Sequence, residues 1–484
     1  MNQKLGRMLW AACSILIVIA AVWGLLVVVG GVLNPQVSAF DARPLLLCIS
    51  LSGFAVVSYL AWPSRWNIVA HTQLAFSIVA YVIPILLLDG LSNVSGAALD
   101  LYAQVIVLGF VACTLGVAIG GWVGRLGDWS RVLDRISFAT FSGLGNMSKR
   151  TQIIVVLSIL GMVASFTVMG FIPALAADPY AAKFFRGEYA VRYGPVAPLY
   201  RLATSAISLL FPLVAMYAWK YRSAKWYMIL VGSLGVMLLS LQREPALSGI
   251  LLFAGILVAT RGRGMWIYFL GILGVYFVGS ALYYVLSLWG VDSFAHGSYA
   301  STSFLAEIAA GSPDVADQIN FFTKWLDRPE YTHGLTFVGG LIPGNFKWNP
   351  SVWSLSVINP GVDVSAISSG GLRLPAPIWG FVSFGWPGVV AVSFGYGFFT
   401  GVLAGFARRL IPSTNLAQAT VLTVIYVSLS DVIPVFFRLS YLSILQVLVA
   451  VILVYWHTSG IRSIEGGSRE GLRQDDLRAF PSIR

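Results

Sequence analysis

The residues of this chain best suited to chemistry are arginines beside apolar segments, where they could bind phosphate. The segment KFFRGEYAVRYG and the apolar stretch after it carry four such basic residues: Lys183, Arg186, Arg192 and Arg201. If residues 179–193 form a helix, the basic side chains lean to one side of it, near Glu188. A guanidinium offers a planar fork of N–H donors to phosphate oxygens, and several together can hold a pyrophosphate. The alternative is that these side chains reach from helix ends to lipid headgroups.

Among single residues, Arg243 gives the strongest indication of a functional site. With Glu244 it interrupts the chain between two apolar stretches, 226–242 and 246–260, that are each short for a full membrane crossing. A charge close to hydrocarbon costs about 2.5–3.5 kcal/mol on insertion scales, so Arg243 needs a partner or a water-filled cavity. Two interpretations remain open, namely a phosphate-binding arginine and a structural ion pair with Glu244.

The composition predicts the kind of fold that holds these residues in place. Hydrophobic residues make up 57% of the chain, charged residues 11%, and the mean hydropathy is +0.80, which indicates a polytopic membrane protein. Apolar stretches that could cross about 30 Å of hydrocarbon number about twelve. They lie at 9–30, 43–62, 70–88, 99–121, 151–171, 198–219, 226–242, 246–260, 266–290, 388–407, 415–431 and 439–457. The expected fold is therefore an all-α membrane helix bundle over residues 1–458.

The distribution of Lys and Arg predicts the orientation of this bundle. Most basic residues fall in the amino terminus, the tail and the alternate connections that an even number of spans places on one side. Positive connections favour the cytoplasmic side, so both termini are expected there, with 459–484 as a flexible cytoplasmic tail. Contacts with anionic lipid then account for the net charge of +11, and no nucleic-acid partner is needed.

A long polar interval, 291–376, falls on the opposite, extracytoplasmic side and is expected to be partly helical. Apolar residues within 301–327 recur at three- and four-residue spacing, which predicts an amphipathic helix or helix pair over the membrane opening. Glycines and prolines punctuate 331–350, which favours an irregular or hairpin-like element. Trp348 of this element offers a flat apolar face that suits a pyranose ring, although Trp is also common at any bilayer interface.

The sequence does not contain the residue patterns that would indicate several other classes of function. The cysteines lie in predicted spans, where they behave as small apolar side chains, and the four histidines are too scattered for a metal motif. Neither a Walker-type phosphate loop nor a nucleophile elbow occurs. We therefore expect no metal site, and no ATP-driven transport within this chain.

Four motifs carry a resemblance to a known family. They are RGEYAVRYGPVAPLYR, LQREPALSGILL, HGLTFVGGLIPGNFKWNP and the glycine-rich GGLRLPAPIWGFVSFGWPGVVAVSFGYGFFTGVL. Together with the many spans and the large late loop, they resemble the Wzy-type oligosaccharide repeat-unit (O-antigen) polymerases, which are related to the O-antigen ligase group. The resemblance covers about residues 150–410.

The resemblance implies a membrane glycosyltransferase of the bacterial inner membrane that uses no cofactor. Such enzymes polymerise undecaprenyl-pyrophosphate-linked repeat units on the outer face of that membrane, with a chain-length regulator protein as a partner. It carries over four donor-phosphate candidates, Arg186, Arg192, Arg201 and Arg243. Arg328 and Arg373 join them on charge alone.

The implied reaction also needs a group that accepts the proton of the acceptor hydroxyl. Glu188, Asp317 and His333 are the candidates, and the sequence does not choose among them. Three alternatives to the polymerase stay open at this point: an O-antigen ligase, a flippase or solute carrier, and a purely structural membrane partner. Carriers usually contain internal repeats, which we do not find here, and few large outer loops.

Overall fold

The computed structural model of the protein describes residues 42–92, 94–124, 144–288, 303–312, 314–342, 346–361, 371–413, 416–432 and 439–455. Before the long polar interval come α2 (Ala42–Val56), η1 (Val57–Leu60), α3 (Ile68–Ser77), η2 (Ile78–Val82), α4 (Ile83–Leu86), α5 (Gly96–Val123), α7 (Leu144–Met169), α8 (Pro179–Lys183), α9 (Glu188–Tyr193), α10 (Ala197–Tyr221), α11 (Ala224–Leu239), α12 (Arg243–Arg261) and α13 (Met265–Leu288). The interval itself holds α14 (Phe304–Ala310), α15 (Asp314–Asp327), α16 (Leu335–Gly339) and α17 (Pro350–Ile358). After it come α18 (Ala376–Leu410), α19 (Leu416–Val432) and α20 (Tyr441–Tyr455). Over these ranges the chain forms helices and no strands, as predicted.

Helices cover every predicted apolar stretch that falls within the described ranges. Among the described residues, six helical segments are long and apolar enough to cross a membrane: Arg43–Leu60, Ile68–Leu86, Gly96–Val123, Met147–Met169, Ala181–Tyr221 and Ala376–Leu410. Shorter apolar helices are Ala224–Leu239, Ser248–Arg261, Met265–Gly279 and Leu416–Ser430. The first predicted stretch, 9–30, and the predicted tail, 459–484, lie outside the described residues. Length and apolarity of the helices agree with the composition in indicating a membrane protein.

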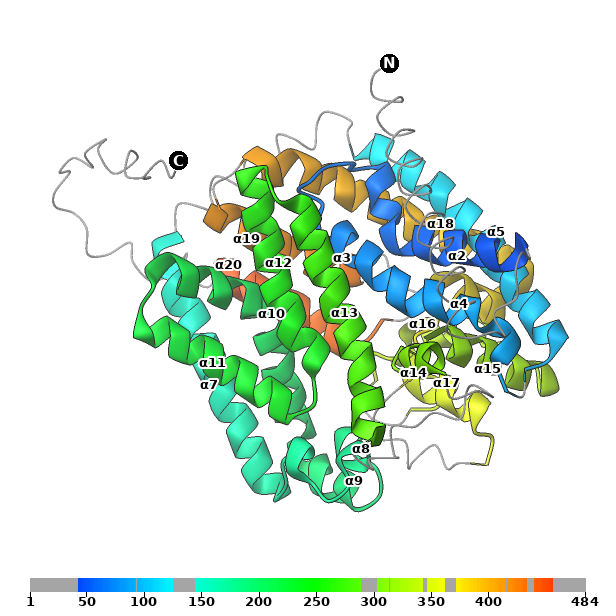
Figure 1. Ribbon diagram of the computed structural model, residues 1–484, viewed down its shortest axis with the longest axis horizontal. Helices are drawn as coiled ribbons and strands as arrows, with labels where there is room; N and C mark the ends of the chain where they lie inside the picture. The colour runs from blue at the N-terminus through cyan, green and yellow to red at the C-terminus, as the bar shows by residue number, and fades with distance from the viewer. Residues whose placement is uncertain are drawn as a thin grey trace.

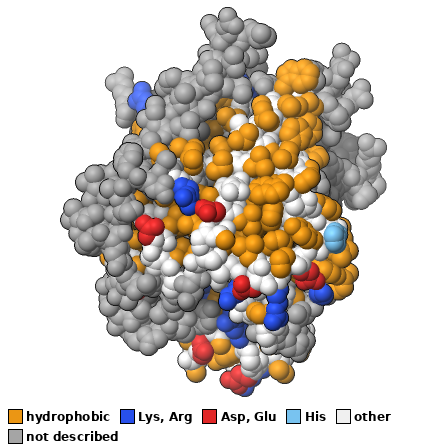
Figure 2. Space-filling model, turned by 90° about the vertical axis from the view of Figure 1, so that its right-hand side faces the viewer, with side chains coloured by type: hydrophobic (Ala, Val, Ile, Leu, Met, Phe, Trp, Pro, Cys, Tyr) orange, Lys and Arg blue, Asp and Glu red, His pale blue; other side chains and the backbone are white. Residues whose placement is uncertain are grey.

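The outward faces of these helices are apolar. On α5, Val111, Leu115 and Ile119 stand four residues apart, which places them on one face of the helix, and they are 52%, 57% and 45% exposed. Figure 2 shows hydrophobic side chains over much of one side of the molecule, with charged side chains gathered mainly in its lower part. A face of this kind suits lipid rather than water.

The helix ends form two groups. At one end the Arg65 guanidinium lies against Gly262, and Nη1 of Arg408 donates a hydrogen bond to the Ala61 carbonyl at 3.4 Å. We call this the basic end, because the neighbouring helix ends also carry Lys and Arg. The short helices α8 and α9 and the loop helices α14–α17 lie toward the other end, the lower part of Figure 1, which we call the loop end.

Helices α5 and α18 approach closely along a line of glycines. A Cβ atom built on Gly397 of α18 would lie 2.1 Å from the Cys113 carbonyl oxygen of α5. One built on Gly120 of α5 would lie 2.0 Å from the Phe398 carbonyl oxygen of α18. Small residues let membrane helices pack backbone to backbone, so this pair forms a rigid support for the loop that precedes α18.

Gly397→Ala is therefore expected to destabilise the protein although alanine favours helices. We expect a loss of about 1–3 kcal/mol, because the added methyl group forces the two backbones apart. The matched control is Gly274→Ala in α13, where a Cβ meets no atom within 4 Å and helix propensity predicts a small gain in stability. Thermal unfolding in detergent measures both variants. Equal melting temperatures for the two would contradict the close packing of α5 and α18.

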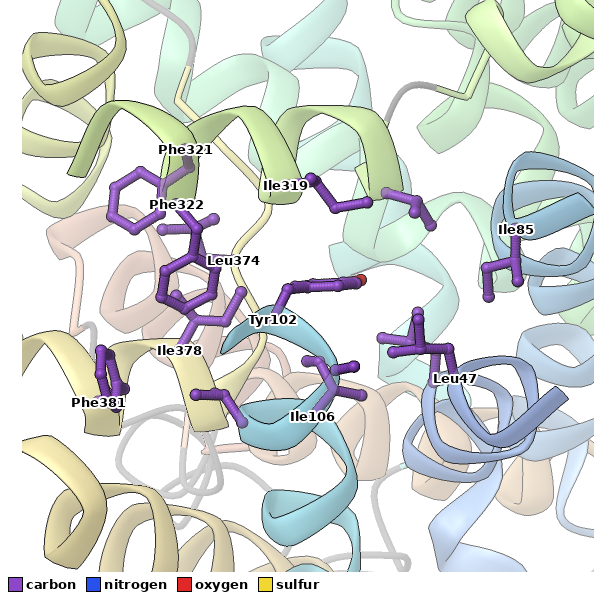
Figure 3. Close-up of a cluster of buried hydrophobic side chains, with 14 of the residues drawn as sticks. Leu47, Ile85, Tyr102, Ile106, Ile319, Phe321, Phe322, Leu374, Ile378 and Phe381 are labelled. Carbon is purple, nitrogen blue, oxygen red and sulfur yellow. The ribbon is translucent and has the colours of Figure 1, made fainter. Parts of the chain in front are cut away.

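The loop is packed onto the bundle through α15, which lies across α5 and the first half of α18 (Figure 3). Ile319 and Phe322 of α15 are fully buried. The Tyr102 hydroxyl of α5 donates to Oε1 of Gln318 at 2.9 Å. Of the helix or helix pair predicted over 301–327, the described residues form the pair α14 and α15. The irregular element predicted over 331–350 contains the short helix α16, and α17 follows it.

Helix α18 is broken near the loop end. Phe384 and Gly385 have non-helical backbone angles, and Gly385 has φ 66° and ψ −149°, a conformation suited to glycine. The backbone N–H of Thr332 donates to the Val382 carbonyl at 2.9 Å, and the hydroxyls of Thr332 and Ser383 lie 2.9 Å apart. The end of the first half of α18 therefore anchors the segment between α15 and α16.

Candidate functional site

Arg201, near the start of α10, is held between two tyrosines from distant parts of the chain. Its Nε donates to the Tyr193 hydroxyl of α9 at 2.8 Å, and its Nη1 donates to the Tyr441 hydroxyl of α20. The guanidinium carbon lies 5.7 Å from the ring centre of Tyr193 and 6.0 Å from that of Tyr441. We call these three residues the arginine–tyrosine site. Hydrogen bonds and ring contacts on two sides orient the planar group before any ligand binds.

An aromatic cluster fixes one side of this site. The rings of Phe185 and Tyr193 stack with centres 3.7 Å apart, and the edge of Tyr200 packs at 5.6 Å from Tyr193. Phe185 has φ 49° and Gly187 has φ 57°, so the chain turns sharply here. The helix considered over 179–193 is consequently interrupted between α8 and α9. Burial of Phe185 against Tyr193 outweighs continued helix, because it removes a large aromatic surface from solvent.

The start of α12 lies at the same end of the helix bundle as the arginine–tyrosine site. Nε2 of Gln242 lies 3.5 Å from the Tyr200 hydroxyl, within hydrogen-bonding distance, after a tight turn in which Leu241 has φ 58°. Arg201 and Arg243 each follow one member of this pair in the chain, so the start of α12 faces the start of α10 at the loop end. The side chain of Arg243 lies outside the part that the structure describes. The N–H groups in the first turn of α12 have no partner within the helix ladder and add positive potential to the region.

The long loop meets the site at the start of α20. The Leu439 N–H donates to the Phe337 carbonyl at 2.9 Å, and the Tyr441 N–H donates to the Gly340 carbonyl at 3.0 Å. Gly340 and Ser440 form a short parallel bridge between these bonds. A Cβ on Gly340 would lie 2.3 Å from the Leu439 carbonyl oxygen, so this approach requires glycine. Helix α16 of the loop therefore lies beside the arginine–tyrosine site.

A second cluster lies at the start of α15. Nη1 of Arg373 is 3.7 Å from Oδ2 of Asp314, whose side chain is only 9% exposed. Nε2 of Gln318 donates to the Arg373 carbonyl at 2.8 Å. The pKa of the Asp317 carboxyl is raised to about 7, chiefly by burial and also by the Asp314 carboxylate, while Arg373 acts in the opposite direction. A carboxyl with a pKa near neutrality is suited to accepting a proton, the role for which Asp317 is a candidate.

The raised pKa of Asp317 predicts a pH-dependent gain in stability for Asp317→Asn. Between the ordinary pKa of 3.8 and about 7, the folded protein keeps a proton that the unfolded chain releases. The contribution of the Asp317 carboxyl to the free energy of unfolding therefore falls as pH rises between these two values. Above it, Asp317→Asn should stabilise the fold by roughly 1–3 kcal/mol, with solvent screening included. Thermal unfolding at pH 5 and pH 8 measures the effect. An equal shift at both pH values would contradict the raised pKa.

Two candidate residues form an exposed pair on α9. Nη2 of Arg192 lies 3.5 Å from Oε2 of Glu188, one helical turn away, and the two side chains are 52% and 68% exposed. Exposed pairs of this kind contribute little to stability, so both side chains can exchange partners at low cost. Arg186 lies in the turn between α8 and α9, with its guanidinium 5.5 Å from the centre of the Phe184 ring.

The remaining candidates lie along the loop. His333 is exposed and has φ 47°, an uncommon angle for a residue with a side chain. Trp348 is half-buried, and Nζ of Lys347 lies 4.6 Å from the centre of its ring. Lys347 in turn pairs with Glu330 at 3.1 Å. Arg328 is exposed just after the end of α15.

The three candidate bases lie on different elements. Glu188 begins α9, the helix that ends with Tyr193 of the arginine–tyrosine site. His333 lies two residues before α16, next to the Thr332 anchor. Asp317 lies in the first turn of α15, a helix of 14 residues that spans about 20 Å at 1.5 Å per residue.

The most important residues missed by sequence reasoning are Tyr193, Tyr441 and Gln242. Tyr193 belongs to the same segment as Arg192, but nothing in the sequence distinguishes it from other interfacial aromatics. Arg201 and Tyr441 are 240 residues apart, so no local spacing connects them. Gln242 directly precedes Arg243, and that position beside an isolated charge was the only available signal.

Comparison of the chain with models of known protein families, with curated proteins and with solved structures gave no match. An oriented arginine, a second arginine at a helix start and an overlying polar loop stand at the end of an apolar bundle. Such an arrangement can bind an anionic group that is attached to a lipid.

Proposed function

We propose that this protein is a membrane glycosyltransferase that polymerises undecaprenyl-pyrophosphate-linked oligosaccharide repeat units on the outer face of the bacterial inner membrane. The observation that carries the proposal is the pair of tyrosines that orients Arg201 beside the start of α12 and the loop helix α16. A lipid pyrophosphate needs cations at the edge of an apolar region, and this site offers them there. The family resemblance of the surrounding motifs supplies the sugar substrate.

The orientation in the membrane is part of this proposal. The basic end would face the cytoplasm, since positive connections are retained on that side. The loop end, with the arginine–tyrosine site, would then face outward, where lipid-linked repeat units arrive after their assembly. The apolar outer faces of α5 and α7 would contact lipid between the two ends.

In the proposed reaction, an acceptor hydroxyl attacks the anomeric carbon of the sugar on the donor lipid. The new glycosidic C–O bond forms as the C–O bond to pyrophosphate breaks, and undecaprenyl pyrophosphate leaves with the negative charge. Arg201 and Arg243 would stabilise that charge in a partly dry site without reorganising. The hydroxyl proton passes to a base. The candidates for this role are Glu188, which shares α9 with Tyr193, His333, which precedes α16, and Asp317 of α15.

The proposal is tested in cells whose gene for this chain is deleted. We expect single repeat units at the surface and loss of the ladder of longer glycans on a gel, with the ladder restored by the intact gene. Long glycans that accumulate on the lipid carrier would instead indicate an O-antigen ligase. Repeat units retained on the cytoplasmic side would indicate a flippase. Either result would contradict the polymerase.

A further inference from the structure

We propose that Tyr441 couples the docking of the long loop to the binding of pyrophosphate at Arg201. This inference rests on the proposed function and adds a regulatory role to the same site. It concerns a positioning residue, because Tyr441 would act through Arg201. The ligand whose binding would be coupled to loop docking is a lipid pyrophosphate.

Tyr441 joins two parts of the molecule through different groups. Its backbone N–H donates to the Gly340 carbonyl of the loop at 3.0 Å, next to the bond from Leu439 to Phe337. Its hydroxyl accepts a hydrogen bond from Nη1 of Arg201, and its ring lies beneath the guanidinium. When the loop segment moves away from residues 439–441, the hydroxyl that orients Arg201 loses its support.

Within the part of the chain that the structure describes, the second tyrosine of the site, Tyr193, packs among α8–α10 rather than against the loop. Tyr193 stacks on Phe185 and packs against Tyr200, all within α8–α10 and the turn between them. It therefore holds Arg201 through Nε whatever the position of the loop. The two hydroxyls form a matched pair, since they bind one guanidinium and only one of them is tied to the loop.

Coupling has a reciprocal consequence. If the docked loop orients Arg201 for pyrophosphate, then bound pyrophosphate must favour the docked loop by the same factor. Sugars held by the loop and phosphates held by the helices would thus be brought together only when both substrates are present. The backbone amides of Leu439 and Tyr441 report on docking, since both donate to loop carbonyls.

Hydrogen exchange of the full-length protein in lipid nanodiscs, with and without undecaprenyl pyrophosphate, tests the proposal. We expect the lipid to slow exchange of the Leu439 and Tyr441 amides by at least about fivefold. The Thr332 amide, bonded to Val382, serves as an internal control and should not respond. Tyr193→Phe should weaken lipid binding and keep the response at saturating lipid. Tyr441→Phe should abolish the response.

Two results would overturn the coupling while leaving the polymerase intact. One is an unchanged exchange rate in the unsubstituted protein once lipid binding is saturated. The other is a response in Tyr441→Phe as large as in Tyr193→Phe. Failure of the unsubstituted protein to bind undecaprenyl pyrophosphate at all would count against the proposed function itself, and the coupling would fall with it.

Discussion

Replacing Arg201 with alanine is expected to lower the rate of polymerisation by about 10²–10³-fold, as is typical when one oriented donor to a developing negative charge is removed. The physical reason is that two tyrosine hydroxyls already fix this guanidinium, so its charge is available to pyrophosphate without reorganisation. Steady-state assays with purified protein and lipid-linked repeat units measure the effect. The decrease should occur mainly in kcat, since the charge on the leaving group grows in the transition state.

Two variants make this expectation specific. Arg201→Lys keeps the charge but cannot bond both tyrosines through a planar fork, so it should recover only a small part of the rate. Arg43→Ala is the matched control, because Arg43 is exposed and pairs with Asp100 at 2.7 Å, at the starts of α2 and α5. It should leave the rate within about twofold, as expected for an exposed ion pair. A rate for Arg201→Ala close to that of Arg43→Ala would remove Arg201 from the mechanism.

Replacing Arg243 with alanine is expected to abolish long glycan chains while single repeat units still reach the cell surface. Arg243 begins α12 directly after the Gln242–Tyr200 contact, which puts it at the level of Arg201. Loss of a second cation from the pyrophosphate site should slow transfer by about 10²-fold. Alanine favours helix, so α12 should still form. Gel analysis of surface glycans from cells that carry only the variant measures the chain length.

The control for this variant lies at the opposite end of the same helix. Arg263 is exposed between α12 and α13, at the basic end, and Arg263→Ala should give normal ladders. Arg243→Lys should restore little if phosphate binding uses the bidentate fork, and much if charge alone is needed. Normal ladders from Arg243→Ala would show that the residue is structural, with Glu244 as the partner considered above.

Much of the fold follows from the length of apolar segments. Stretches of about 20 apolar residues are nearly bound to be helical in a membrane, because backbone polar groups find no other partners there. The three- and four-residue spacing of apolar residues located α14 and α15. The apolar face of α15 packs on α5 and α18, and that of α14 packs on α4 and α13. The break in α18 at Gly385 was not predicted. A span was expected from residue 388, whereas the helix begins at Ala376 and turns at the break.

The site was less predictable for a different reason. Charge and position in the sequence singled out Arg201 and Arg243, since a guanidinium near hydrocarbon needs an explanation wherever it occurs. The partners of Arg201 depend on which helices pack together. Tyr193 and Tyr441 come from α9 and α20, and only the tertiary structure brings them to one guanidinium. The condition of one helix over 179–193 is met only in part, as α8 and α9, because the stacking of Phe185 on Tyr193 interrupts the helix.

The proposed function requires this chain to form glycosidic bonds with a lipid-pyrophosphate leaving group. Purified full-length protein, incubated with lipid-linked repeat units and no nucleotide sugar, tests this requirement. We expect a ladder of glycans that grows by whole repeat units, with one undecaprenyl pyrophosphate released for each new bond. Folded protein that binds the lipid-linked unit and forms no glycosidic bond would contradict it.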